Sequence, residues 1–356
     1  MRILLTGASG FAGSLLLPPL LAQGHHVRAL ARDPQRVTLA LERQSPHLLG
    51  IGDARAHAHA HAHADAHADA HADADADAQR ERLQILQGDA LTGEGLREAF
   101  RGTSVAYYLI HSMEAPNPES DPDGTFAQRE AIAAENFARE AQRAGVERIV
   151  YLGGLLPAPA PGEDPPRNIS RHLASRAAVE ELLREAVPET VALRASIVIG
   201  ARSRSFRFLV RLVERLPVLT LPAWRNFRTQ PIDSRDVTQM LLSAACAPVA
   251  GRSLDIGGPD ILTYGELISG IADEMLVNRP TLGLRVNLTP MTARFAAAIA
   301  GEDPELIVPL MEGLHGDLLP RDDHADELLS VKLHSFDSAV SHALGEWEKS
   351  EPLAAR

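Results

Sequence analysis

The chain begins with the apolar run Met1-Arg2-Ile3-Leu4-Leu5-Thr6, and the glycine-spaced stretch Gly7-Ala8-Ser9-Gly10-Phe11-Ala12-Gly13 follows directly. The apolar run predicts a strand, and residues 14–23, which end before Gly24, predict a helix. A strand that turns in this way into a helix presents free backbone N–H groups and the positive end of the helix dipole. We therefore expect a pyrophosphate site formed by Gly7, Ser9, Gly10, Phe11, Ala12 and Gly13. The spacing G-x-x-G-x-x-G is one residue wider at its start than the usual dinucleotide fingerprint, so the flanking strand and helix carry the prediction.

Predicted strands and helices alternate through the first two thirds of the chain. Runs rich in Val, Ile and Leu predict strands at residues 2–6, 26–31, 83–87, 104–110, 148–153 and 190–199. Helical patterns lie between the later strands, at residues 95–100, 125–144 and 170–186. This alternation predicts an α/β fold, a Rossmann-type doubly wound parallel sheet that binds ligands beyond the carboxyl ends of its strands.

The last part of the chain predicts a second, smaller region. From about residue 206 onward the sequence has helical patterns, many prolines and a Gly257-Gly258-Pro259 turn. We predict a dinucleotide-binding Rossmann domain over residues 1–205. A small C-terminal substrate lobe, or cap, over residues 206–356 is expected to be partly interleaved with it.

Residues 56–78 form a strict two-residue repeat, in which alanine alternates with six histidines and five aspartates. Because His and Asp are ligands for zinc, nickel and copper, a metal-binding tract is one interpretation. The favoured interpretation is a disordered insertion over residues 54–80, because the tract has no bulky apolar residue to offset the entropy cost of ordering. We therefore assign no metal site.

Composition and charge exclude several classes of protein. A formal net charge of −12 over 356 residues disfavours nucleic-acid binding, which needs clustered Lys and Arg. The single cysteine, Cys246, excludes a disulfide framework, and we expect it to be a small buried residue in a helix. No apolar run approaches the roughly 20 residues of a membrane span, and the opening strand leaves no room for a signal peptide. We expect a cytoplasmic protein with a small-molecule substrate and no membrane partner; the oligomeric state stays open.

Two further positions bear on the nucleotide. Arg32 ends the second predicted strand, where a dinucleotide-binding fold meets the adenosine ribose. An arginine there accommodates a 2′-phosphate, so Arg28 and Arg32 favour NADP(H) over NAD(H), although Asp33 makes the pattern mixed. After the third strand, Asp89 and Ala90 are placed to meet the adenine, while a plain turn aspartate is the alternative for Asp89.

Taken together, these motifs resemble the atypical short-chain dehydrogenase/reductases, in particular the NmrA-like NAD(P)H-binding branch. The matching segments are residues 6–13, 88–89, 107–113, 136–138, 148–155, 193–195, 198–200, 230–232 and 257–264. The resemblance covers nearly all of the chain except the His/Ala/Asp repeat and the last twenty or so residues. It implies a Rossmann domain, a small substrate lobe and a nicotinamide cofactor, with Leu109, His111 and Gly153 near that cofactor at the carboxyl ends of two strands.

The chain departs from the catalytic pattern that the resemblance implies. Active members carry a serine just after the fifth strand and a Tyr-x-x-x-Lys pair on the next helix. Here the serine positions hold Gly153 and Gly154, and the Tyr and Lys positions hold His172 and Arg176. The i, i+4 spacing puts these two side chains on one helix face. Histidine is able to act as general acid or base, and arginine to anchor a ribose or phosphate, so we expect His172 and Arg176 at the catalytic site.

Two alternatives remain open at this point. The helix that carries Arg171, Arg176, Glu180, Glu181 and Arg184 could instead be a solvated face, and His111 could be a histidine satisfied near a turn. For function, the first reading is an NADP(H)-dependent oxidoreductase that reduces a small carbonyl or quinone-like substrate. The second reading is a non-catalytic NAD(P)H sensor or assembly protein of NmrA-like type, which the two glycines and the missing Tyr/Lys pair favour.

Overall fold

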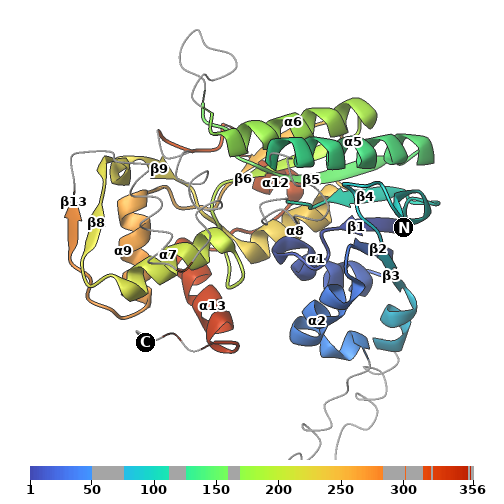
Figure 1. Cartoon of the computed structure of the whole chain (residues 1–356). Coiled ribbons are helices and arrows are strands. Elements are labelled where there is room, and N and C mark those ends of the chain that lie inside the picture. The colour runs from blue at the N-terminus through green and yellow to red at the C-terminus, as the bar shows by residue number, and fades with distance from the viewer. Residues whose placement is uncertain are drawn as a thin grey trace, which may run out of the picture. The chain divides into compact units, whose positions relative to one another are not determined.

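The protein is seen in a computed structural model, which describes residues 1–49, 76–111, 126–158, 169–283, 301, 316–321, 324–351 and 353. Its main feature is a seven-stranded sheet in the order β11-β6-β5-β4-β1-β2-β3 (Figure 1). The strands are β1 (Arg2–Thr6), β2 (His26–Ala31), β3 (Leu83–Gln87), β4 (Val105–Tyr108), β5 (Arg148–Gly154), β6 (Val191–Ala195) and β11 (Ser253–Ile256). The predicted α/β fold with a Rossmann-type parallel sheet is confirmed.

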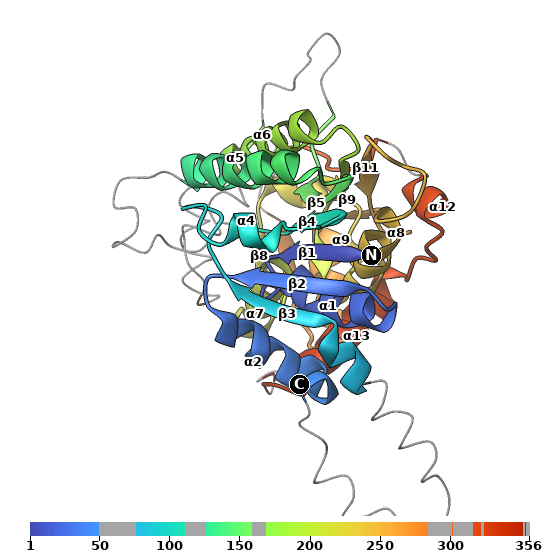
Figure 2. The same ribbon diagram turned by 90° about the vertical axis from the view of Figure 1, so that its right-hand side faces the viewer.

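Strand β1 is an interior strand of the sheet, with apolar side chains on both faces. Ile3, Leu4 and Leu5 are each at most 1% exposed, as expected for a parallel strand covered on both faces. It pairs in parallel with β2 on one side and with β4 on the other. Figure 2 shows β4, β1, β2 and β3 as successive neighbours. The order reverses between β1 and β4, so the carboxyl ends of these two strands form the switch point at which such sheets bind ligands.

Three predicted strands, at residues 2–6, 26–31 and 83–87, coincide with β1, β2 and β3. The strand predicted over 190–199 is instead divided into β6 and β7 (Val198–Ile199). The carbonyl of Ile197 accepts a hydrogen bond from the N–H of Ile232, and β7 pairs with β10 (Ile232–Asp233). The chain therefore leaves the main sheet after Ala195 and pairs elsewhere.

The chain folds into two interleaved compact units. Unit 1 comprises Met1–His111, Ile132–Tyr151 and Leu183–Thr190; unit 2 comprises Ser112–Ala131, Leu152–Leu182 and Val191–Arg356. Residues 253–256, within the predicted cap region, add the edge strand β11 beside β6. The boundary predicted after residue 205 stays a prediction. Most of the predicted insertion over 54–80 lies outside the described residues, and residues 76–81 at its end form a helix.

In unit 1, helices pack along the strands through apolar and aromatic side chains. The helices are α1 (Phe11–Ala22), α2 (Pro34–Gln44), the 3-10 helix η1 (Pro46–Leu49), α4 (Leu96–Ala99) and, from Ile132, α5 (Phe126–Ala144). Helices α1 and α2 lie side by side (Figure 1). Phe137 of α5 packs edge-on against Phe100 and against Tyr108 of β4, at centroid distances of 4.9 Å in both cases. These rings fix α5 against the strands that end at the switch point.

Unit 2 has its own apolar core, formed by helices and short strand pairs. Its further elements are α6 (Arg171–Ala186, up to Leu182), α7 (Arg204–Arg215), β8 (Leu219–Leu221), the 3-10 helix η3 (Ala223–Asn226), β9 (Arg228–Thr229), α8 (Ser234–Ala244), β12 (Leu262–Thr263), α9 (Tyr264–Glu274), β13 (Thr281–Gly283), α12 (Ala325–Leu329) and α13 (Phe336–Glu348). Helices α7, α9 and α13 contribute most of the core, and Trp347, Phe206 and Leu267 are fully buried there. Within the residues that are described, no helix is long and apolar enough to cross a membrane.

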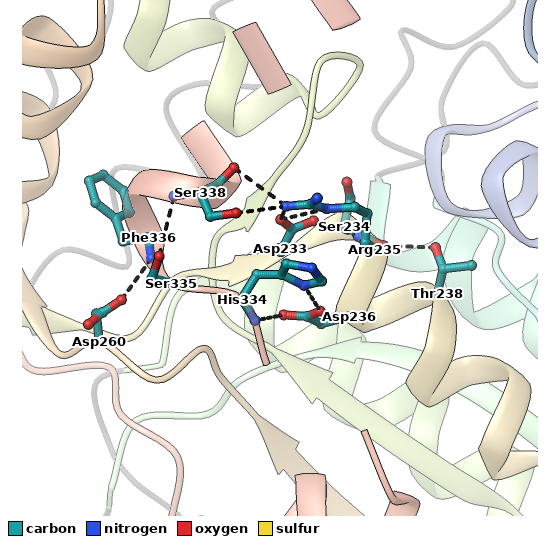
Figure 3. Close-up of polar contacts among 10 residues, drawn as sticks. All are labelled: Asp233, Ser234, Arg235, Asp236, Thr238, Asp260, His334, Ser335, Phe336 and Ser338. Carbon is teal, nitrogen blue, oxygen red and sulfur yellow. Dashed lines mark hydrogen bonds and ion pairs between the residues drawn. The ribbon is translucent and has the colours of Figure 1, made fainter. Parts of the chain in front are cut away.

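Helix α13 is held at its start by a cluster of polar contacts (Figure 3). Asp236 of α8, only 1% exposed, accepts hydrogen bonds from the backbone N–H of His334 at 2.8 Å and from its Nδ1 at 2.6 Å. The carboxylate of Asp260 accepts from the N–H of Phe336 at 2.7 Å. Arg235, which pairs with Asp233, reaches Ser338 at 3.3 Å. The aspartates thereby satisfy N–H groups that precede or open the helix.

We expect Asp236→Asn to lower the free energy of unfolding by about 1.5–3 kcal/mol, because the amide replaces one of two acceptor oxygens that serve His334. Urea titration followed by circular dichroism measures the loss. The exposed Asp273 of α9 offers a matched control, and Asp273→Asn is expected to stay within about 0.5 kcal/mol of the parent chain. Equal losses in the two variants would contradict the assigned role of the Asp236 carboxylate.

One expectation about composition is wrong. Cys246 is exposed and lies in the turn after α8, rather than buried within a helix. The apolar residues Leu241, Leu242 and Ala244 take the buried positions of that segment.

Candidate functional site

The glycine loop between β1 and α1 has the backbone geometry that its sequence predicts. Gly7 adopts φ +72, a left-handed conformation that side chains disfavour. Its carbonyl accepts a hydrogen bond from the N–H of Gly10 at 2.9 Å, which closes the turn. A Cβ on Gly13 would collide with the carbonyl oxygen of Gly7, so α1 approaches the loop more closely than any side chain permits. Glycine is therefore required at position 7 by the backbone angle and at position 13 by the lack of space for a side chain.

The first turn of α1 is suited to hold a pyrophosphate. Gly10 is the N-cap residue, is exposed, and makes no side-chain capping bond to the N–H groups of the first turn. Among the heavy atoms of the described residues, a Cβ at Gly10 would approach only the carbonyl oxygen of Gly7, at 3.1 Å. Ser9, Phe11 and Ala12 are partly exposed around it. Backbone N–H groups at a helix start, left without a capping side chain, form an anion site.

The structure brings Leu109 to this loop. The position of a Cβ on Gly7 lies 2.5 Å from the carbonyl oxygen of Leu109, just after β4. Strand β4 ends at Tyr108, earlier than predicted, so Leu109 and the exposed His111 belong to the segment that leaves the sheet. Leu109 therefore borders the candidate pyrophosphate site, and the predicted role of His111 stays a prediction.

The two arginines that favour NADP(H) in the sequence, Arg28 and Arg32, have different surroundings in the structure. The guanidinium of Arg28 donates to the side chain of Gln84 at 3.1 Å and to the carbonyl of Ala99 at 3.2 Å, so it is occupied within unit 1. Arg32 is exposed directly after β2. The carboxylate of Asp33 caps α2 by accepting from the N–H of Gln35 at 2.9 Å. This cap accounts for the acidic residue that made the pattern mixed.

The loop after β3 is built around Asp89. Its side chain accepts from the N–H of Leu91 at 2.9 Å, and its own N–H donates to the carbonyl of Glu94. Asn136 of α5 donates to the carbonyls of Ala90 and Leu91, at 3.0 Å in both cases. Asp89 is thus a turn aspartate, the alternative weighed for it, and its predicted contact with adenine stays a prediction.

In unit 2, the start of α6 packs against the end of β5 at Gly154, the second of the two glycines at the serine positions. A Cβ on Gly154 would lie 2.8 Å from Cδ2 of Leu173, the residue after His172. A serine at that position would therefore have to displace Leu173. Gly153 lies beside it in β5. Leu173 therefore packs directly on the backbone of Gly154.

Arg176 is buried, which corrects the alternative of a solvated helix face. Arg176 is 7% exposed and Glu180 is 4% exposed, while Arg171 and Arg184 are exposed. Nη1 of Arg176 lies 3.5 Å from Oε1 of Glu130, and its Nη2 donates to the carbonyl of Leu152 in β5. The guanidinium is therefore directed to the end of β5.

His172 lies on the same helix face, one turn before Arg176. Its ring is half-buried and lies 6.1 Å from the ring of Phe126, centroid to centroid, at an interplanar angle of 41°. With Leu173 packed on Gly154 and Arg176 bonded to Leu152, this turn of α6 runs along the end of β5. His172 thus belongs to a helical turn whose neighbouring residues contact β5, and its role as a proton donor stays a prediction.

The sequence alone does not single out Glu130, Asp236 or His334, and it marks Asn136 only as part of a matching segment, without a role. Their partners lie 45 to 98 residues away in the chain, and no local pattern connects such distant positions. Among the described residues, no group of three or more His, Cys, Asp or Glu side chains gathers as a metal site.

Solved structures with the same fold cover nearly the whole chain. The UDP-glucuronic acid 4-epimerase from Bacillus cereus in complex with NAD superposes with a TM-score of 0.66 at 16% identity, over 98% of this chain and 99% of that one. The UDP-glucose 4-epimerase of Thermotoga maritima superposes with a TM-score of 0.64 at 14% identity, over the same shares. At such identities the likeness shows the fold alone.

Sequence comparison adds the family. Cinnamoyl-CoA reductase 1 of Oryza sativa subsp. japonica is 28% identical over 149 residues, 42% of this chain and 33% of that protein. The NADH dehydrogenase [ubiquinone] 1 alpha subcomplex subunit 9 of Arabidopsis thaliana is 30% identical over 100 residues, 28% of this chain and 25% of that protein. The chain thus aligns with a third or less of these curated relatives. The model of the NAD dependent epimerase/dehydratase family matches residues 3–257. The chain therefore belongs to this family, an extended branch of the short-chain dehydrogenase/reductases.

Proposed function

We propose that the chain is an NADP(H)-dependent oxidoreductase that reduces a small carbonyl or quinone-like substrate. The observation that carries the cofactor is the glycine loop, where Gly7 at φ +72 and the uncapped first turn of α1 form an anion site at the switch point. Family membership supports a nicotinamide dinucleotide. The alignment with a cinnamoyl-CoA reductase supports a reductive reaction.

His172 is the proton donor in this proposal, and Arg176 is the anchor for a ribose or phosphate. The bound cofactor, once reduced, supplies the hydride. The imidazolium form of His172 donates its proton to the substrate oxygen as general acid and becomes neutral imidazole, a task for which histidine is suited near neutral pH. Arg176 stays protonated at all such pH values, so it binds and orients but does not relay a proton. Gly153 and Gly154 carry no hydroxyl that could orient a carbonyl.

We propose that Arg32 reads the 2′-phosphate of NADP(H). It stands exposed at the end of β2, and the neighbouring Asp33 is engaged in capping α2. Arg32→Asp removes a charge-assisted bond and places a carboxylate near the phosphate. We expect NADPH affinity to fall about 10–100-fold, with NADH affinity unchanged or improved. Fluorescence titration of both cofactors measures the ratio.

The matched control is Arg43→Asp, which makes the same charge change at an exposed arginine in the last turn of α2. It is expected to leave the NADPH to NADH ratio within about twofold, because charges beyond a Debye length are screened. An unchanged ratio in Arg32→Asp would show that the 2′-phosphate is read by another residue.

A non-catalytic NAD(P)H sensor or assembly protein of NmrA-like type is the second candidate function. The two glycines at the serine positions favour it, as does the replacement of the Tyr/Lys pair by His172 and Arg176. The alignment with a subunit of the NADH dehydrogenase complex also favours it.

One experiment separates the two functions. Purified protein is mixed with NADPH and a panel of quinones and aldehydes, and the absorbance of the reduced nicotinamide is followed. The oxidoreductase predicts a loss of absorbance with at least one acceptor. Tight binding of NADPH without oxidation by any acceptor would favour the sensor.

A further inference from the structure

Glu130 is a buried carboxylate that links α5 to the start of α6. It is 2% exposed, and Oε2 accepts a hydrogen bond from the hydroxyl of Ser175 at 2.7 Å. Oε1 lies 3.5 Å from Nη1 of Arg176, whose Nη2 donates to the carbonyl of Leu152. One carboxylate thus contacts two successive residues of α6, and the second of them reaches the end of β5.

Helix packing alone does not require such a contact. Burying a carboxylate and a guanidinium is unfavourable unless they are paired and hydrogen-bonded, and apolar side chains of similar volume would hold two helices together at least as well. What the ion pair adds is direction, because a planar guanidinium between a carboxylate and a carbonyl has a fixed orientation.

The orientation of the Arg176 guanidinium matters because β5 ends in two glycines, which have no side chains to contact α6. Leu152 is followed by Gly153 and Gly154, and Leu173 packs directly against Gly154. The turn of α6 that carries His172 is therefore located by two contacts with β5. One is the polar bond from Arg176 to Leu152, and the other is the apolar contact of Leu173 with Gly154.

We propose that Glu130 is a positioning residue of the site, which acts by orienting Arg176. Through Arg176 it holds the turn of α6 that carries His172 against the main chain at Leu152. This inference rests on the proposed NADP(H)-dependent function, with Arg176 as the anchor. Glu130 contacts the anchor and the adjacent Ser175, and its proposed effect on cofactor binding passes through Arg176.

A double-mutant cycle with Glu130→Gln, Arg176→Gln and the double variant tests this. NADPH affinity is measured by calorimetry, thermal stability by circular dichroism, and kcat and KM with an accepted substrate. Glu130→Gln is expected to weaken NADPH binding about tenfold, the effect of one impaired charge-assisted hydrogen bond. Because Glu130 acts through Arg176, the double variant is expected to bind NADPH no more weakly than Arg176→Gln alone.

Glu180→Gln is the matched control. Glu180 lies on the same helix, is 4% exposed, and pairs with Arg194 at 2.7 Å and 2.8 Å. It is expected to lower the melting temperature without changing NADPH affinity. If Glu130→Gln does not fold, Glu130→Asp replaces it in the cycle, because it keeps the charge and withdraws it by one methylene group.

The outcomes are distinct. An unchanged NADPH affinity in the Glu130 variant, with only the melting temperature lowered as in Glu180→Gln, would overturn the positioning role while leaving the proposed function intact. Additive losses in the double variant would also overturn it, since Glu130 would then act independently of Arg176. Absence of NADPH binding by the parent chain would overturn the proposed function and this inference together.

Discussion

Replacing His172 with alanine is expected to lower kcat by about 10²–10⁴-fold while NADPH affinity stays nearly unchanged. A positioned proton donor contributes a factor of this size, and alanine leaves none at the position. The ring of His172 lies near that of Phe126, at a centroid distance of 6.1 Å. Its removal therefore takes away an acid group from a helix turn that Leu173 and Arg176 still hold in place. Single-turnover oxidation of NADPH and calorimetric titration measure the two quantities separately.

His342→Ala provides the control, because His342 is exposed on α13 in unit 2. That variant is expected to keep the kcat of the parent chain. A second variant, His172→Gln, keeps a hydrogen-bonding group of similar size but carries no ionisable proton, and it is expected to be about as slow as His172→Ala. Full activity in either His172 variant would exclude the residue from proton transfer.

Replacing Gly7 with alanine is expected to weaken dinucleotide binding by at least about 10²-fold, which corresponds to the loss of one or two charge-assisted hydrogen bonds. The new Cβ would lie 2.5 Å from the carbonyl oxygen of Leu109, so the loop or the end of β4 has to move. The N–H groups of the α1 start would then no longer converge on one phosphate. Calorimetry with NADPH measures the loss of affinity.

Gly145 offers a matched control for the backbone effect. It has φ +66, close to the +72 of Gly7, but a Cβ there meets nothing within 4 Å. Gly145→Ala therefore introduces the same left-handed strain, about 1–2 kcal/mol, without a collision. We expect it to lower thermal stability and leave NADPH affinity intact. Comparable affinity losses in Gly7→Ala and Gly145→Ala would show that stability, rather than the shape of the loop, controls binding.

The parts of the fold that depend on local pattern could be predicted from sequence. Strands β1, β2 and β3 and the glycine loop follow from apolar runs and from turns within a few residues. Pairing between distant segments could not be predicted in this way. Residues 190–199 are rich enough in apolar side chains to predict one strand, yet the chain leaves the main sheet after Ala195 and pairs with the segment at Ile232. Likewise, β11 joins the main sheet from a segment assigned to the cap.

The same contrast between local patterns and distant partners applies to the residues of the candidate site. Gly7, Gly10 and Gly13 act through their own backbone, so their sequence spacing carries the information. For Arg176 and Glu180 the sequence leaves a solvated face open as an alternative, because their helix is rich in charge. The structure buries both residues, since Glu130 and Arg194 supply partners from outside α6. Charge alone does not distinguish an exposed helix face from one whose counter-charges come from elsewhere in the chain.

Dinucleotide binding by the glycine loop is measured most directly by isothermal titration of the purified chain with NADPH and with NADH. We expect at least one of them to bind at a single site with a dissociation constant well below a millimolar, NADPH to bind more tightly, and Gly7→Ala to abolish the signal. If neither cofactor associates at millimolar concentration, the loop between β1 and α1 does not hold a dinucleotide, and the proposed function is wrong.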